Sequence, residues 1–437
     1  MSNTPQKKQE DLVGLSRKSI VNQLHAIKDS LIQRPPDNNM HGLTEENKLA
    51  WLFKNIAHLG NSHYPYQIYA KPSVNNGIFP LVQKEKGPVT IALLADWASC
   101  TEESIQIAKL TGEQDYSIHL GDTYYVGNSK EIADNFNDTY GGAWPYGTQG
   151  SFALLGNHEM YSSGKSYFTE LLPYMGAFCD GKDMLRQEAS YFCLENEHWR
   201  IIGLDTGYDS LKGFFGLSAK TNLQLPEQQM AWLRDIVQPG KDKRGIIFLS
   251  HHQCFSAFEK DEFQAIIPQL APLLGAGRTV LWFWGHEHRL AFYGYNPLAG
   301  DTGCFSRCIG HSGMPVETQL FKVKAPEPTA PSNRNLVMYD QRVRKIIDEN
   351  ISLGHNGYVV LHLDGPGLIA SYYDDSFVDS RGLRAAIAEE EWSIDTVSGK
   401  LTGINIVDRT AGAPSPASGN LSHFQPDIRL AISRDGQ

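Results

Sequence analysis

Short apolar runs recur along the middle of the chain, and segments with helical periodicity lie between them. The runs occupy residues 89–95, 116–120, 152–155, 245–250 and 280–284. Continuous apolar runs of this length, bounded by turn residues, are typical of strands that are buried on both faces. Apolar spacing and helix-start signals predict helices over 102–111, 130–138, 226–237 and 259–274. This alternation of strand and helix predicts an α/β domain.

Two further stretches each predict a pair of adjacent strands. Residues 191–205 divide into two apolar segments at the polar residues 195–197. Residues 357–363 and 368–373 flank Asp364-Gly365-Pro366-Gly367, which is a strong hairpin signal.

One main domain and an extension at each end would account for the 437 residues. We expect the domain to span 88–375, with a loop insertion at about 315–355 that contains a predicted loop at 324–334. Residues 376–437 form a predicted C-terminal extension, which is partly of low complexity at 411–419.

Residues 1–87 form a predicted N-terminal helical extension. Apolar side chains recur at helical spacing over 10–33 and over 44–59, with Pro35-Pro36 between the two segments. Most such stripes face a core, so we expect the helical pair to dock on the main domain. An amphipathic pair of this kind could instead contact a partner subunit.

The charge and the apolar pattern exclude several classes of protein. The formal net charge of -10, without a basic run, argues against binding of extended nucleic acid. The polar amino terminus lacks the apolar stretch of a signal peptide, and no apolar stretch is long enough to span a bilayer. The six cysteines fit neither a disulfide framework nor a four-cysteine zinc site, although a Cys304–Cys308 disulfide is an alternative. We therefore expect a cytoplasmic enzyme with no membrane partner and leave the oligomeric state open.

A residue that can bind a metal ion follows each of the five apolar runs. In an open α/β sheet, ligands bind beyond the carboxyl ends of the strands, so these residues should converge. Together they would hold two metal ions, with Asp122 as the bridge between the ions. The other predicted ligands are Asp96 and His288 for one ion, and Asn157, His251 and His286 for the second. In an extended stretch, His286 and His288 would point the same way and each bind a different ion.

The ordered motifs resemble those of the calcineurin-like metallophosphoesterases. The motifs are Asp96-Trp97-Ala98, Gly121-Asp122, Gly156-Asn157-His158-Glu159, His251 and Gly285-His286-Glu287-His288. The resemblance covers about residues 88–313, and five motifs in this order are highly specific. It implies a four-layer α-β-β-α sandwich with two mixed sheets.

One departure from the family pattern indicates which members of the family the chain resembles most. Many members have a metal-binding histidine where this chain has Ala98, which cannot coordinate a metal ion. Gly121-Asp122-Thr123-Tyr124-Tyr125 is similar to the G-D-x-x-Y motif of the purple acid phosphatases, in which the tyrosine binds iron. The resemblance implies Fe(III) bound by Tyr125, with Fe(II), Zn(II) or Mn(II) at the second position. Alternatively, Tyr125 only lines the pocket.

The resemblance also implies a mechanism, in which a metal-bound hydroxide attacks phosphorus. Asp122 and His158 would be catalytic residues, and His158 would contact the phosphoryl group and protonate the leaving oxygen. Asn157 and His158 would also contact substrate, and His252 would either do the same or point away from the pocket.

The leading hypothesis is a dinuclear metal-dependent hydrolase, similar to a phosphatase, that cleaves a small phosphorylated substrate. A phosphodiesterase acting on a nucleotide-type substrate would use the same two metals. A dinuclear metalloenzyme with a non-phosphate substrate and a metal-binding scaffold without hydrolase activity are the other two alternatives.

Overall fold

The computed structural model describes most of the chain between residues 62 and 408. The described segments are 62–69, 75–82, 86–137, 143–179, 183–212, 218–219, 223–259, 262–318, 335–347, 349, 351–376 and 385–408. The predicted helices over 10–33 and 44–59 and the predicted loop at 324–334 lie outside these segments.

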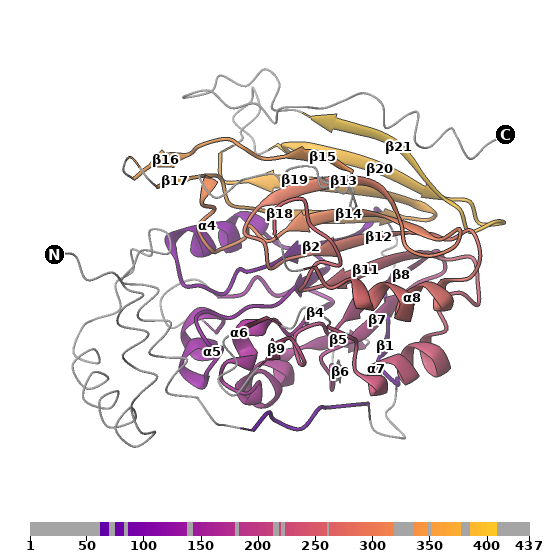
Figure 1. The fold of residues 1–437 in the computed structure, drawn as a ribbon, viewed down its shortest axis with the longest axis horizontal. Coiled ribbons are helices and arrows are strands. Elements are labelled where there is room, and N and C mark those ends of the chain that lie inside the picture. The colour runs from indigo at the N-terminus through magenta and orange to yellow at the C-terminus, as the bar shows by residue number, and fades with distance from the viewer. Residues whose placement is uncertain are drawn as a thin grey trace.

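Two large mixed sheets form the centre of the described structure (Figure 1). One has eight strands in the order β1 (Ile78–Pro80), β7 (Phe192–Glu195), β8 (Trp199–Leu204), β11 (Gly245–Ser250), β12 (Thr279–Trp284), β14 (Gly303–Ile309), β13 (Leu290–Pro297) and β15 (Leu336–Tyr339). The other has nine strands in the order β21 (Leu401–Asp408), β20 (Ala388–Ile394), β19 (Gly367–Asp374), β18 (Gly357–Asp364), β2 (Val89–Leu94), β3 (Tyr116–His119), β4 (Gly150–Ala153), β5 (Gly176–Cys179) and β6 (Asp183–Arg186). Two small hairpins pair β9 (Leu211–Lys212) with β10 (Ser218–Ala219), and β16 (Lys345–Ile346) with β17 (Ser352–Leu353). The predicted mixed α/β fold with two large mixed sheets is therefore confirmed.

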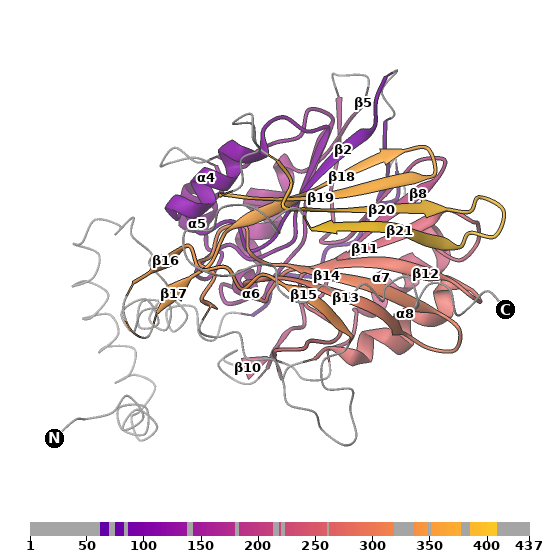
Figure 2. The ribbon, with the colours of Figure 1, turned by 90° about the horizontal axis from the view of Figure 1, so that it is seen from above.

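Helices cover the outer faces of the sheets. One has the predicted bounds 102–111, whereas the helix predicted over 259–274 begins at residue 264 and the one predicted over 130–138 ends at residue 135. The α-helices of the described segments are α4 (Glu102–Thr111), α5 (Ser129–Asn135), α6 (Asn157–Met160), α7 (Glu227–Trp232) and α8 (Ile267–Leu274). Short turns of other helix types are η1 (Tyr167–Leu171), η2 (Leu172–Tyr174), η3 (Leu233–Val237), which extends α7, and η4 (Gln264–Ile266), which precedes α8. Figure 2 shows α7 and α8 on the outer side of the eight-stranded sheet and α4 and α5 beside the nine-stranded sheet. None of the helices in the described segments is long and apolar enough to cross a membrane.

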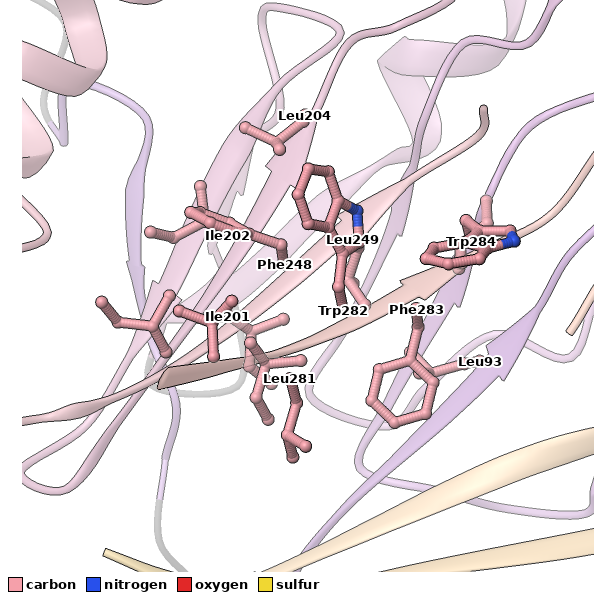
Figure 3. Close-up of a cluster of buried hydrophobic side chains, with 14 of the residues drawn as sticks. Leu93, Ile201, Ile202, Leu204, Phe248, Leu249, Leu281, Trp282, Phe283 and Trp284 are labelled. Carbon is pink, nitrogen blue, oxygen red and sulfur yellow. The ribbon is translucent and has the colours of Figure 1, made fainter. Parts of the chain in front are cut away.

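The alternation of side chains along the central strands produces the layers. On β2, Ile91 and Leu93 join the core between the sheets, whereas Ala92 and Leu94 pack in the cluster that includes Ile107 of α4. The buried strands β8, β11 and β12 likewise carry apolar side chains on both faces (Figure 3). This explains why these strands occur in the sequence as continuous apolar runs rather than as alternating ones.

The central strands of each sheet are parallel, and this brings their carboxyl ends together. In the nine-stranded sheet, β2, β3 and β4 are parallel neighbours. In the eight-stranded sheet, β8, β11, β12 and β14 are parallel neighbours. The residues that follow these strands therefore lie at one edge of each sheet.

Strands β20 and β21 continue the nine-stranded sheet, although they fall within the predicted C-terminal extension. A buried ion pair links β20 to the other sheet, because Arg307 Nε of β14 donates to both carboxylate oxygens of Glu390 at 3.0 Å. Tyr372 Oη of β19 donates to Glu390 Oε2 at 2.7 Å. On the same strand as Arg307, Cys304 and Cys308 are buried free thiols, so the alternative disulfide is not formed.

We expect Glu390→Ala to lower the free energy of unfolding by about 3–5 kcal/mol, because it leaves the buried Arg307 guanidinium without its carboxylate. The neighbouring Glu391 is exposed, so Glu391→Ala should change stability by less than about 0.5 kcal/mol. Urea unfolding followed by tryptophan fluorescence measures both variants. Equal stabilities would show that the ion pair does not hold the two sheets together.

Candidate metal centre

Six predicted metal ligands lie at the shared edge of the two sheets. Asp96, Asp122 and Asn157 follow β2, β3 and β4, and His251, His286 and His288 follow β11 and β12. The carboxylates of Asp96 and Asp122 are buried, and both lie within a few Å of imidazoles from the opposite sheet. The structure thus brings all six residues together.

The first group of donor atoms centres on a phenol. Tyr124 Oη lies 2.7 Å from Asp96 Oδ1 and 3.0 Å from Asp122 Oδ2. The same oxygen lies 2.8 Å from His288 Nε2, which is 3.5 Å from Asp96 Oδ1. Tyr124 Oη therefore lies within 3.0 Å of two carboxylate oxygens and one imidazole nitrogen.

The second group combines imidazoles with an amide and the other Asp122 oxygen. His251 Nε2 lies 3.2 Å from Asn157 Oδ1 and 3.3 Å from Asp122 Oδ1. The other ring nitrogen, His251 Nδ1, donates to the carbonyl of Leu120 at 2.9 Å, which leaves Nε2 free to bind a cation. His251, His252 and His286 each offer a nitrogen, and these atoms lie within 4.8 Å of one another.

Asp122 contacts both groups of donor atoms: Oδ2 belongs to the first group and Oδ1 to the second. Burial alone would raise its pKa, but the nearby imidazoles of His251 and His158 lower the pKa well below its ordinary value. Burial lowers the pKa of His251, but Asp122 reverses this effect and raises it to about 9. Burial and the charge of His251 lower the pKa of His286 to about 3. His286 is therefore neutral near pH 7 and can present a lone pair to a cation.

Three of the candidate ligands have a strained backbone. The φ angles are 56° at Asp96, 73° at Asp122 and 65° at His286, in the left-handed region that non-glycine residues rarely adopt. The prediction of an extended stretch through His286 is therefore wrong. His286 and His288 still face different groups, because the left-handed residue turns the chain between them. Such strain persists where the surroundings fix the backbone, and it is concentrated at functional sites.

The glycines of the motifs let the backbone approach the carboxylates. A Cβ atom on Gly156 would lie 2.1 Å from Asp122 Oδ1, and one on Gly285 would lie 2.6 Å from Asp96 Oδ2. Neither contact is possible for a larger residue without displacing the carboxylate.

Glu159 fixes the loop that carries Asp122, and the sequence prediction gave it no role. This buried carboxylate accepts from the backbone nitrogens of Thr123 (2.5 Å), Gly156 (2.9 Å) and Asp122 (3.3 Å). Burial and the charge of Asp122 raise the pKa of Glu159 to about 7. The acidic fourth position of the G-N-H-[DE] motif was the available signal.

His158 lies at the accessible side of the centre. Its side chain is 17% exposed, compared with 1% for Asp122, and Nε2 lies 3.7 Å from Asp122 Oδ2. His158 Nδ1 lies 2.5 Å from the carbonyl oxygen of Tyr125, which orients the ring. The backbone nitrogen of His158 donates to Asp122 Oδ1 at 3.0 Å.

His252 and Tyr125 have other surroundings. His252 is buried, with Nδ1 3.2 Å from Thr206 Oγ1 and its ring against that of His286. Tyr125 packs in an apolar cluster with Tyr124, Val126 and Met314, and burial, followed by the charge of Glu131, raises its pKa. The phenolic oxygen that lies among the candidate ligands belongs to Tyr124.

A protein-family model agrees with this geometry. Residues 89–290 match the model of the calcineurin-like phosphoesterases, and this segment contains every candidate ligand. This segment is a calcineurin-like phosphoesterase domain. The family is metal-dependent, and this segment contains groups of side chains that could hold a metal ion.

The solved structures that are similar to this chain have low sequence identity to it. GAP50, the anchor in the inner membrane complex of Plasmodium, is 13% identical with a TM-score of 0.43, and the match covers 72% of this chain and 93% of GAP50. A purple acid phosphatase from yellow lupin seeds is 14% identical with a TM-score of 0.46, and the match covers 74% of this chain and 56% of the lupin protein. No curated protein sequence matches the chain significantly.

We expect Glu159→Ala to weaken Zn(II) binding by the phosphoesterase domain about 10- to 100-fold, because three backbone donors around Asp122 lose their acceptor. Glu113 is exposed, and Glu113→Ala is the control. Isothermal titration calorimetry measures both affinities. If Glu159→Ala bound Zn(II) as tightly as the control, Glu159 would have no part in positioning Asp122.

Proposed function

We propose that the chain is a hydrolase that uses two metal ions to cleave a phosphate ester. The observation that carries the proposal is the pair of buried donor groups that share Asp122, one oxygen in each group. Two-metal sites of this kind clamp the attacking and leaving oxygens of a displacement at phosphorus. The phosphoesterase family of residues 89–290 agrees with this chemistry.

The donor groups suit two different ions. Asp96, Asp122 and a phenol oxygen form a hard, anionic set, which favours Fe(III) over a divalent ion. The imidazoles of His251 and His286, with the amide oxygen of Asn157, suit Fe(II), Zn(II) or Mn(II). The pairing resembles that of the purple acid phosphatases, and we propose a phosphatase of that type.

When bound, the two ions would lower the pKa of a water molecule towards neutrality and neutralise charge on the phosphoryl oxygens. Side chains of the protein would bind the phosphoryl group and transfer the proton. His158, at the accessible side, would hold a phosphoryl oxygen or donate the Nε2 proton to the leaving oxygen. The carbonyl of Tyr125 accepts from the Nδ1–H of His158, so the ring would carry an Nε2 proton for the leaving oxygen in its imidazolium form.

We propose a small phosphorylated substrate, because the net charge of -10 disfavours extended nucleic acid. The same ligands serve a monoesterase and a diesterase, so a nucleotide-type diester is the alternative substrate. A cytoplasmic location also remains a proposal from the sequence.

The test is hydrolysis of p-nitrophenyl phosphate and of bis(p-nitrophenyl) phosphate by the full chain, purified in air, over a range of pH. We expect turnover that a chelator abolishes and that added metal restores. Asp122→Asn should abolish it too, because Asp122 belongs to both donor groups. Preference for the diester would favour the phosphodiesterase. With both metals bound and neither compound cleaved, the protein would be an enzyme with a non-phosphate substrate or a scaffold.

His158→Ala should keep both metal ions and lower kcat about 10²- to 10⁴-fold, because the variant lacks the acid that protonates the leaving oxygen. The matched control is His198→Ala, since His198 is a partly exposed residue remote from the donor groups. Metal analysis and steady-state kinetics check the two parts of the expectation. A kcat equal to that of the control would remove His158 from the mechanism.

A further inference from the structure

The geometry points to Tyr124, rather than Tyr125, as the residue whose phenolate oxygen binds the first metal ion. The G-D-x-x-Y spacing assigns this role to Tyr125, so the inference departs from the motif. It rests on the proposed function, because it needs a metal ion between Asp96 and Asp122.

The first argument is the separation of the donor atoms. Ligand atoms about 2.1 Å from one ion, at right angles to each other, lie about 3 Å apart. Tyr124 Oη lies 2.7 Å from Asp96 Oδ1, 3.0 Å from Asp122 Oδ2 and 2.8 Å from His288 Nε2. All three distances are those expected of ligands that share an ion.

The second argument is the position left empty by Ala98. Ala98 follows Asp96 by two residues, and its buried side chain offers no donor atom. Ala98 forms a bridge with Thr123, and its carbonyl oxygen accepts from the backbone nitrogen of Tyr124 at 2.9 Å. Asn135 Nδ2 donates to the carbonyl of Tyr124 at 2.6 Å. The backbone of Tyr124 is therefore fixed on both sides, and the phenol supplies the oxygen that this group would otherwise lack.

The third argument is that Tyr125 contributes its backbone to the site. Its carbonyl oxygen accepts from His158 Nδ1 at 2.5 Å, and its side chain shares an apolar cluster with Tyr124, Val126 and Met314. Tyr124 thus places its hydroxyl oxygen among the donor atoms, whereas Tyr125 offers its backbone carbonyl to His158.

Metal binding in this arrangement exchanges a proton for a cation. The O–H bond of the Tyr124 phenol breaks, a metal–oxygen bond forms, and the proton leaves to the solvent. No electron is transferred. A phenolate bound to Fe(III) absorbs visible light by charge transfer, which gives a readout that does not depend on hydrolysis.

The experiment loads the metal-depleted full chain with Fe(III) and Zn(II) and records the visible spectrum beside the metal content. Tyr124→Phe and Tyr125→Phe form a matched pair, because each removes one hydroxyl from neighbouring residues. We expect the wild-type protein and Tyr125→Phe to absorb in the visible range. We expect Tyr124→Phe to lose this band and to bind Fe(III) at least 10-fold more weakly, while Zn(II) remains bound.

A band that disappears in Tyr125→Phe and persists in Tyr124→Phe would overturn the assignment. An iron-loaded wild-type protein without the band would overturn it as well. Should Tyr124→Phe fail to fold, the spectrum of Tyr125→Phe still decides, since a retained band supports Tyr124 and a lost band excludes it.

The hydrolysis assay separates this inference from the proposed function. A coloured protein whose band depends on Tyr124 but which cleaves neither ester would keep the assignment and refute the phosphatase. A colourless protein that hydrolyses the monoester would keep the phosphatase and refute the assignment.

Discussion

Buried negative charge is the constraint on which the centre depends. Asp96, Asp122 and Glu159 are all less than 2% exposed, and they lie within one small region at the sheet edges. Buried charges are costly unless they are paired or coordinate metals. Backbone amides satisfy Glu159, whereas Asp96 and Asp122 share a phenol and imidazoles whose donor atoms point at common centres. Cations at these centres would compensate the two carboxylates and use the imidazoles as neutral ligands.

The fold makes this concentration of charge possible. Parallel strands from two sheets end at a common edge, so each strand end contributes one or two donors at little cost in chain length. The left-handed backbone at Asp96, Asp122 and His286 costs about 1–3 kcal/mol per residue. The apolar core on both faces of the central strands holds these ends in place (Figure 3). The packing of the core thus offsets the free-energy cost of the strained backbone at the sheet edge.

The sequence predicted most of the fold and six of the side chains that converge at the sheet edge, because strand periodicity and the residues that end each strand are local properties. The strands at 89–94 and 245–250 and the hairpin at 357–374 follow directly from the apolar pattern. The left-handed conformation of His286 did not follow from the apolar pattern. The backbone nitrogen of His286 donates to Asp96 Oδ2, and local propensity does not encode this contact between residues far apart in the sequence. The choice between Tyr124 and Tyr125 depends on Ala98 and Asn135, which are distant in sequence. The place of β20 and β21 in the main sheet likewise depends on long-range pairing and on Glu390.

The central claim is that the two donor groups hold two ions that share Asp122. The most direct measurement is an anomalous-difference map from crystals of the metal-loaded protein. The account predicts two peaks, one among Asp96, Tyr124 and His288 and one among Asn157, His251 and His286, with Asp122 between them. A single peak, or two peaks without Asp122 between them, would contradict it.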